Sequence, residues 1–319
     1  MYWLGIDLGG TNIAAGVVDE NYKIIGTGKC KTNAGKSADE IADDMAAAAF
    51  DAIKDAGIEK EQISSMGIGA PGSIIAETGV VAFANNLGFE NVPLCDMLQA
   101  RTGFKTYIEN DANAAAFGEL LAGAGKGKRS FVAITLGTGV GGGIIIDNKI
   151  LSGFNNVGGE LGHTVMVYNG EPCTCGRKGC FEAYASATAL IRQTKTAMLK
   201  DKSSIMWELV GGNIDATSGR TAFDAMRKGD KSAKEVVDKY TEYIAVGVTN
   251  MVNIFQPETL CIGGGISKEG ETLVAPIREY ANRTAFSKNL PEKDKTEIKA
   301  AELGNDAGII GAAMLYKLH

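Results

Sequence analysis

The chain has 319 residues, of which 45% are hydrophobic and 22% charged, a balance typical of a folded globular protein rather than a disordered one. This length is enough for two domains of ordinary size. A net charge of -6 argues against a basic surface for DNA or RNA. No apolar run approaches the ~20 residues that span a bilayer, and no secretory signal is visible, so we expect a cytoplasmic protein.

The first seventy residues predict three strands, a helix and a fourth strand. Apolar runs at YWLGIDL, IAAGVV and KIIGTG are separated by the turn signals GGTN and DENY. An amphipathic helix follows from Ser37 to Ala56, and then a strand at Ser64–Ala70.

The opening pattern returns near Phe131. "IDLGGTNIAAGVVDENYKIIG" and "ITLGTGVGGGIIIDNKILSG" align almost residue for residue as strand, Gly/Thr turn, strand, Asp/Asn turn and strand. A repeat of this length indicates two related α/β halves. Between the copies, a strand at Lys105–Glu109 runs into a helix at Asp111, where we place the domain crossing. We expect a smaller domain, 1–112 plus a C-terminal helix at about 305–319, and a larger domain, 113–304.

The remainder of the chain is expected to be mainly helical. Amphipathic patterns predict helices at Ala183–Lys200 and Lys231–Phe255. The segment ETLCIGGGIS predicts a strand that enters a glycine turn, and the last helix is expected to be capped by Asn305 or Asp306.

The Gly/Thr turns predict phosphate binding. Such a turn points backbone N–H groups at one spot and has no side chains that would block an anion. Asp7 precedes the first turn, where its carboxylate could hold the magnesium ion of a nucleotide, and Thr11 and Thr138 could each add a hydroxyl group. A third glycine turn could let an adenine or ribose lie against the backbone. The candidate nucleotide-binding residues are Asp7, Gly9, Gly10, Thr11, Asn12, Gly137, Thr138, Gly139, Gly263, Gly264 and Gly265.

Each of these turns also has a purely structural explanation. GGTN and GTG are ordinary hairpin turns when taken singly, and GGG is an ordinary strand-to-helix turn. The matching positions of the first two in a repeat favour the phosphate interpretation. Neither carries the Walker lysine, and no spaced G-x-G-x-x-G precedes a helix, so P-loop and dinucleotide-binding folds are poor matches.

Five motifs together resemble the ROK family of sugar kinases, in particular its bacterial glucokinases: IDLGGTN, IENDANAAAFGE, LGTGVGGG, GGELGH and CTCGRKGCFEAYAS. The resemblance extends over essentially the whole chain. It implies the two-domain actin-like ATPase fold of actin, Hsp70 and hexokinases, a ribonuclease H-like α/β fold with an interdomain cleft. It also implies a homodimer that uses ATP and Mg²⁺ to convert glucose to glucose 6-phosphate, the entry step of glycolysis.

The resemblance also implies roles for single residues. Asp111 would be the general base that takes the proton of the sugar's primary hydroxyl as it attacks the γ-phosphate, and it could equally be a helix N-cap. Glu182 is as well explained as an acid in the first turn of a helix, and Glu160 as a surface charge. Amides and carboxylates suit a site that recognises each hydroxyl of a sugar. The implied sugar-binding residues are Asn86, Asn110, Asp111, Glu160, His163 and Glu182.

One histidine and three cysteines form a candidate zinc site. The four residues are His163, Cys173, Cys175 and Cys180. They supply a closed tetrahedral set with no open position, so zinc would be structural and would hold Glu160 and Glu182 toward the sugar. The resemblance implies that the histidine ring contacts the sugar as well. The alternative is three free thiols and a surface histidine.

Other functions stay open at this point. The stretch from Asn85 to Phe89 reads NNLGF, whereas the family's glucokinases often have Pro-Asn-Leu-Gly-Trp, so N-acetylmannosamine, mannose, allose and fructose remain alternative substrates. A sugar-responsive ROK regulator would need a DNA-binding segment, and the first phosphate turn begins at Gly9, which leaves no room for one. An actin-like ATPase without a sugar would not need the cysteine segment or its paired glutamates.

Overall fold

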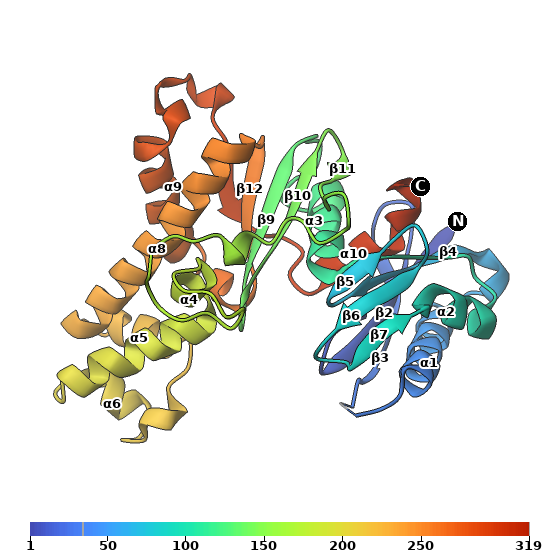
Figure 1. Ribbon diagram of the computed structural model, residues 1–319, viewed down its shortest axis with the longest axis horizontal. Coiled ribbons are helices and arrows are strands. Elements are labelled where there is room, and N and C mark those ends of the chain that lie inside the picture. The colour runs from blue at the N-terminus through green and yellow to red at the C-terminus, as the bar shows by residue number, and fades with distance from the viewer. Residues whose placement is uncertain (34, 319) are drawn as a thin grey trace. The chain divides into compact units, whose positions relative to one another are not determined.

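The computed structural model describes residues 1–33 and 35–318, which divide into two compact units (Figure 1). Unit 1 comprises residues 1–133, 143–159 and 301–319, and unit 2 comprises residues 134–142 and 160–300. Helix α3 (Asp111–Ala122) groups with unit 1 because it packs on α10 (Asp306–Ala313). The functional division at Asp111, into 1–112 plus about 305–319 and 113–304, stays a prediction.

Unit 1 contains the predicted meander at the edge of a five-stranded sheet. The sheet has the order β3-β2-β1-β4-β8. β1, β2 and β3 pair antiparallel, whereas β1, β4 and β8 are parallel. The strands are β1 (Tyr2–Leu8), β2 (Asn12–Val18), β3 (Ile24–Lys31), β4 (Ile63–Ala70) and β8 (Thr106–Asn110).

Helices pack closely on both faces of this sheet. α1 (Ala38–Ala56) covers β2 and β3, and it begins with a capping box in which Ser37 accepts a hydrogen bond from the Glu40 N–H at 3.3 Å. α10 covers β1 and β4. A Cβ atom at Gly5 would collide with the backbone of α10, so this strand position needs glycine for the helix to approach.

A three-stranded sheet in unit 1 was not predicted. It has the order β5-β6-β7 and is antiparallel throughout. Its strands are β5 (Ser73–Ile75), β6 (Val80–Ala84) and β7 (Phe89–Val92). The turn between β6 and β7 carries Asn86, and α2 (Leu94–Thr102), which packs on α1, follows the sheet (Figure 1).

The second five-stranded sheet confirms the internal repeat. Its order, β11-β10-β9-β12-β13, matches that of the first sheet, with three strands of a meander followed by two further strands. β12 and β13 are parallel, and β10 and β11 are antiparallel. The strands are β9 (Phe131–Leu136), β10 (Val140–Ile146), β11 (Lys149–Ile150), β12 (Thr259–Gly263) and β13 (Glu297–Ala300).

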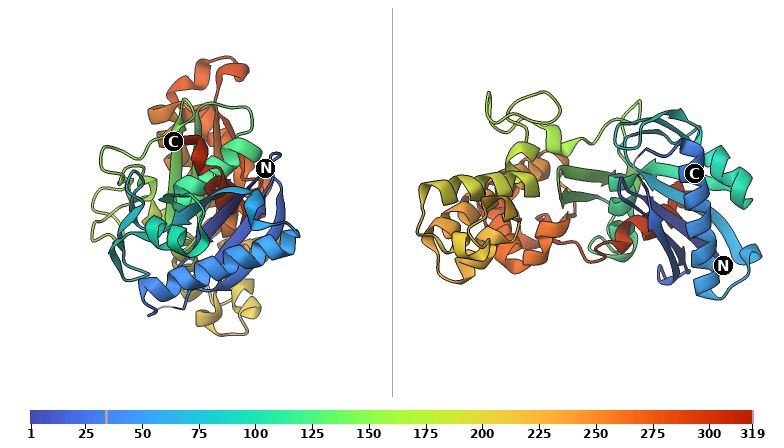
Figure 2. Two further views of the ribbon diagram at one scale, coloured as in Figure 1. Left: turned by 90° about the vertical axis from the view of Figure 1, so that its right-hand side faces the viewer. Right: turned by 90° about the horizontal axis from the view of Figure 1, so that it is seen from below.

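Unit 2 contains a group of helices (Figure 2). The predicted helix Lys231–Phe255 is confirmed as α8. The predicted single helix at 183–200 is wrong, because Ser186 interrupts it and caps the second part, with its hydroxyl accepting from the Ala189 N–H at 3.1 Å. The helices are α4 (Glu182–Ala185), α5 (Ala187–Lys200), α6 (Ile205–Leu209), α7 (Thr221–Arg227), α8 and α9 (Glu271–Thr284).

The last helix differs from the prediction at its start. Asn305 occupies the N-cap position of α10, but its side chain makes no capping hydrogen bond, and Asp306 is the first helical residue. In the described part of the chain, no helix combines the length and the apolar character needed to cross a bilayer.

Candidate functional site

The first glycine turn is held by a buried threonine. The Gly9 N–H donates to the Asn12 carbonyl at 2.9 Å. Thr32 then donates its hydroxyl to the Gly9 carbonyl at 2.7 Å and its N–H to the Thr11 carbonyl at 3.0 Å. A Cβ atom at Gly10 would lie 3.0 Å from Nδ2 of Asn86, so the Asn86 amide rests against the turn.

Two aspartates of unit 1 lie close enough for their charges to interact. Asp7 is on β1, and Asp111 follows β8 directly as the first residue of α3. Burial raises the pKa of Asp7 to about 6, and the negative charge of Asp111 adds to the rise. Burial also raises the pKa of Asp111, against the opposing effect of hydrogen bonds from the Ala112 and Asp111 N–H groups. Both carboxylates therefore sit where a bound cation or a transferred proton would be favourable.

Asn110, rather than Asp111, is the N-cap of α3. Its side-chain oxygen accepts from the N–H groups of Ala112 at 3.0 Å and Asn113 at 3.3 Å, and its amide nitrogen donates to the Gly72 carbonyl at 3.2 Å. The interpretation of Asp111 as the cap is wrong, because the cap stands one residue earlier. Asp111 is thus placed by the helix start without being its capping group.

The second glycine turn, residues 137–139, contacts the start of the helical region. The Ala187 N–H donates to the Gly137 carbonyl at 2.8 Å, and the Thr188 hydroxyl donates to the Thr138 carbonyl at 2.8 Å. The Val140 N–H donates to Oε2 of Glu182 at 3.0 Å. Glu182 therefore touches a turn that sequence alone did not connect with it.

The third glycine turn is explained mainly by packing. Gly264 has φ 87°, and a Cβ atom there would lie 2.5 Å from the carbonyl oxygen of Leu136. A Cβ at Gly265 would meet open space, whereas Gly263 is a buried residue of β12. Close packing on β9 accounts for Gly264, and the adenine contact of this turn stays a prediction.

The histidine and three cysteines converge as predicted. The ligand atoms of His163, Cys173, Cys175 and Cys180 lie within 4.8 Å of one another. The Cys173 Sγ to His163 Nδ1 distance is 3.6 Å, and the Cys175 Sγ to Cys180 Sγ distance is 3.7 Å. Ligands of a tetrahedral zinc ion with bonds of about 2.3 Å are about 3.8 Å apart. The four side chains thus fit a structural zinc ion.

The six predicted sugar-binding residues are divided between the units. Asn86, Asn110 and Asp111 belong to unit 1, and Glu160, His163 and Glu182 belong to unit 2. Glu160 is exposed, and its carbonyl accepts from the His163 N–H at 3.1 Å in a single 3₁₀ turn, Leu161–His163.

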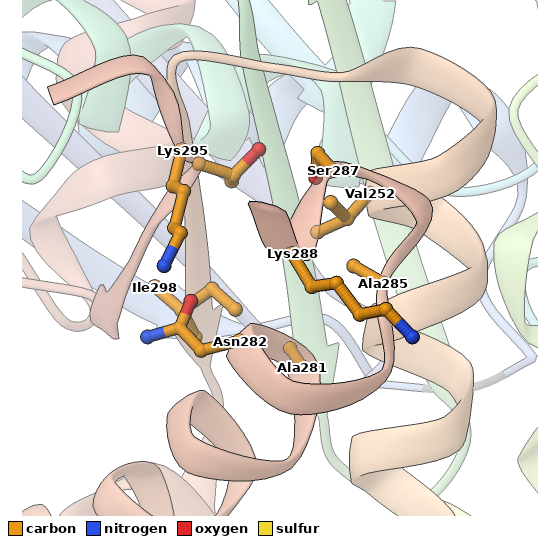
Figure 3. A pocket seen from close by; sticks show the side chains of 9 residues that line it. Val252, Ala281, Asn282, Ala285, Ser287, Lys288, Lys295 and Ile298 are labelled. Carbon is orange, nitrogen blue, oxygen red and sulfur yellow. The ribbon is translucent and has the colours of Figure 1, made fainter. Parts of the chain in front are cut away.

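Three hollows lie on unit 2, and no predicted site residue lines them. A hollow of about 410 Å³ is lined by residues of α5 and α8, and another of about 320 Å³ by residues of α7, α8 and α9. A third, between Lys288 and Lys295, has only about 10 Å³ and holds no more than a water molecule (Figure 3).

A family model described as the ROK family matches residues 3–318. The chain belongs to the ROK family. A glucokinase from Thermotoga maritima is 40% identical over 316 residues, which cover 98% of this chain and 96% of that protein. A glucokinase from Streptomyces coelicolor is 39% identical over 316 residues, covering 98% and 97%.

A solved structure gives the same result. The ROK family glucokinase of Streptomyces griseus, in complex with glucose and AMPPNP, superimposes with a TM-score of 0.83 at 38% identity and covers 99% of both chains. The resemblance and the actin-like sugar kinase fold are therefore confirmed.

Several contacts of this ROK protein were not predicted from its sequence. Thr32 and Thr188 each donate a hydroxyl hydrogen bond to a glycine turn, and Thr174 donates one from the cysteine loop to Glu182. No sequence signal distinguishes them, because their partners lie between 8 and 50 residues away along the chain.

Proposed function

We propose that this ROK protein is a glucokinase, transferring the γ-phosphoryl group of ATP to the 6-hydroxyl of glucose. The observation that carries the proposal is the placement of Asp111 at the start of α3, near Asp7 and in the same unit as the first glycine turn. The nucleotide and sugar bound by the Streptomyces griseus glucokinase support both substrates.

Asp111 acts as the general base in this proposal. The sugar oxygen forms a bond to the γ-phosphorus while the bond between that phosphorus and the β,γ-bridging oxygen breaks, and ADP leaves. The proton of the sugar hydroxyl passes to the Asp111 carboxylate. Burial raises the pKa of this carboxyl group toward the operating pH, which makes it a better proton acceptor than an ordinary aspartate.

Asp7 would hold the magnesium ion of the nucleotide. Its carboxylate lies on β1 beside the first turn, and burial together with the charge of Asp111 raises its pKa, so a bound cation would favour its ionised form. Mg²⁺ supplies neutralisation of charge on the phosphate oxygens when bound. The remaining proposed nucleotide contacts are Gly9, Gly10, Thr11, Asn12, Gly137, Thr138, Gly139, Gly263, Gly264 and Gly265.

The sugar contacts are Asn86, Asn110, Asp111, Glu160, His163 and Glu182. His163 can serve both sites because its Nδ1 faces the cysteine cluster, which leaves Nε2 for a sugar hydroxyl. A structural zinc ion in the cluster would fix the ring in this orientation. We further propose that the protein is cytoplasmic and works as a homodimer.

A coupled ADP-release assay tests the function. Magnesium-ATP is supplied with glucose, mannose, fructose, N-acetylmannosamine or N-acetylglucosamine, together with a control without sugar. Selective turnover of glucose is expected. Preference for another hexose would reassign the pocket but keep the Asp111 chemistry, whereas turnover that does not depend on sugar would contradict a sugar kinase.

A further inference from the structure

The carboxylate of Glu182 bridges two loops of unit 2. Its Oε2 accepts from the N–H of Val140, the residue that follows the second glycine turn, at 3.0 Å. Its Oε1 accepts from the Thr174 hydroxyl at 3.0 Å, and the Cys173 sulfur lies 3.6 Å away. One half-buried side chain thus links the metal-binding loop to the turn proposed to hold phosphate.

The position of Thr174 depends on whether the cluster holds a metal ion. It lies between Cys173 and Cys175, two of the four candidate metal ligands, so binding of a metal fixes the backbone on both sides of it. Its side chain is exposed, and its hydroxyl donates a hydrogen bond to Glu182. The cluster therefore reaches Glu182 through the Thr174 hydroxyl and through the Cys173 sulfur, and Glu182 in turn contacts Val140.

The glycine at the end of the turn fits this contact. A Cβ atom at Gly139 would collide with Oε2 of Glu182, so the carboxylate occupies the space that a side chain would need. The turn is also held by Ala187 and Thr188, from the start of α5. Residues 182–188 therefore contact the turn and the residue after it through three hydrogen bonds, made by Glu182, Ala187 and Thr188. Of these three residues, Glu182 also contacts the cysteine loop.

We propose that Glu182 is a positioning residue, in addition to its proposed contact with the sugar. Through it, the presence of metal in the cluster determines the shape of the second phosphate turn. This inference rests on the proposed function, because it takes the turn to bind nucleotide phosphates. Metal binding orders Thr174, Thr174 holds Glu182, and Glu182 fixes the N–H group of Val140 and with it the shape of the turn. Nucleotide affinity then depends on the metal even without sugar.

Thr174→Val tests the middle of this path, because it removes the hydroxyl without changing a metal ligand. Binding of AMPPNP with Mg²⁺ is measured by calorimetry in the absence of sugar. The dissociation constant is expected to rise about threefold to tenfold, because one exposed hydrogen bond of ordinary strength is lost. KM for ATP should rise similarly, with a much smaller change in kcat. Thr196→Val is the matched control, since the Thr196 hydroxyl bonds only its own helix, at the Arg192 carbonyl.

Two further measurements separate positioning from a general loosening of the loop. In a Glu182→Ala background, Thr174→Val should have no added effect on AMPPNP binding. Removal of the metal by a chelator should weaken AMPPNP binding in the unmodified protein and much less in Glu182→Ala. Zinc content and circular dichroism establish that each variant is folded and loaded before binding is measured.

Unchanged AMPPNP affinity in Thr174→Val would overturn the inference, as would an equal loss in the Glu182→Ala background. Such a result would leave the kinase function standing if glucose-dependent ADP release persists. Conversely, absence of sugar-dependent ADP release would contradict the proposed function, even where Thr174→Val weakens nucleotide binding as expected.

Discussion

Asp7 on β1 and Asp111 at the start of α3 carry like charges that act on each other inside unit 1. Burial raises the pKa of Asp7 to about 6, and the charge of Asp111 contributes to that rise. Burial raises the pKa of Asp111 as well. At neutral pH the fold therefore holds two carboxylates that would be easier to ionise in the unfolded chain, and this costs folding stability.

Asp7→Asn should stabilise the protein at neutral pH and inactivate it. Asp7 titrates near 3.8 in the unfolded chain and near 6 in the folded protein, so between these values the folded state binds more protons. Stability then falls as pH rises through this window, and the variant avoids the loss. Urea unfolding at pH 5 and pH 8 should show a larger gain for Asp7→Asn at pH 8. Asp51→Asn, at an exposed position of α1, is the control. If Asp7→Asn gained no more stability at pH 8 than at pH 5, the expectation would be refuted.

Asp111→Asn should nearly abolish turnover while leaving glucose binding measurable. Loss of a general base lowers kcat by about 10²- to 10⁴-fold. In the unmodified protein, kcat/KM should fall on the acid side at a pH above the ordinary value of ~3.9 for aspartate, because burial raises the pKa of Asp111. Steady-state rates from pH 4.5 to 8 and calorimetry with glucose provide the measurements. Near-normal turnover of the variant would exclude Asp111 as the base.

Cys175→Ser should remove the metal from the cluster. Elemental analysis of the unmodified protein is expected to give one zinc ion per chain, and the variant far less, because one of four ligands is weakened. Thermal unfolding should begin at a lower temperature in the variant and in protein treated with a chelator. Cys30→Ser is the control, since this residue lies outside the cluster. Full zinc retention in Cys175→Ser would show that the cysteine is no ligand.

Glu119→Gln should destabilise unit 1. The Glu119 side chain is buried and accepts from the N–H groups of Ala124 at 2.9 Å, Glu302 at 3.1 Å and Leu303 at 2.7 Å. An amide has only one acceptor oxygen, so at least one of these three N–H groups loses its partner, at a cost of about 1–3 kcal/mol. Denaturant titration measures this, with exposed Glu61→Gln as the control. A change below about 0.5 kcal/mol would mean that the loop rearranges to satisfy these groups.

Local signals accounted for most of the fold. The strand repeat and α8 were predictable, because alternation and a 3.6-residue period mark them directly and Asp230 supplies the cap of α8. The break at Ser186 was not, because serine is tolerated within a helix and becomes a cap only when the chain turns. The small sheet that carries Asn86 consists of strands of three to five residues, too short for alternation to mark.

The candidate site was predictable in its residue types and less so in its contacts. The cluster of His163, Cys173, Cys175 and Cys180 could be recognised because ligand spacing is local. Asn110 as the cap of α3 could not be separated from Asp111, since both residue types cap helices. The contact of Glu182 with Val140 joins residues 42 positions apart, and only folding brings them together.

The packing of α10 on β1 and β4 sets an order of events during synthesis. Residues 160–300 are all synthesised before α10. Their synthesis takes roughly 7–28 s at about 5–20 residues per second. Throughout that interval the sheet that contains Gly5 lacks the helix that covers one of its faces. The first part of the chain to be made is thus among the last to be completed, and the nascent protein exposes an apolar surface for which chaperones are suited.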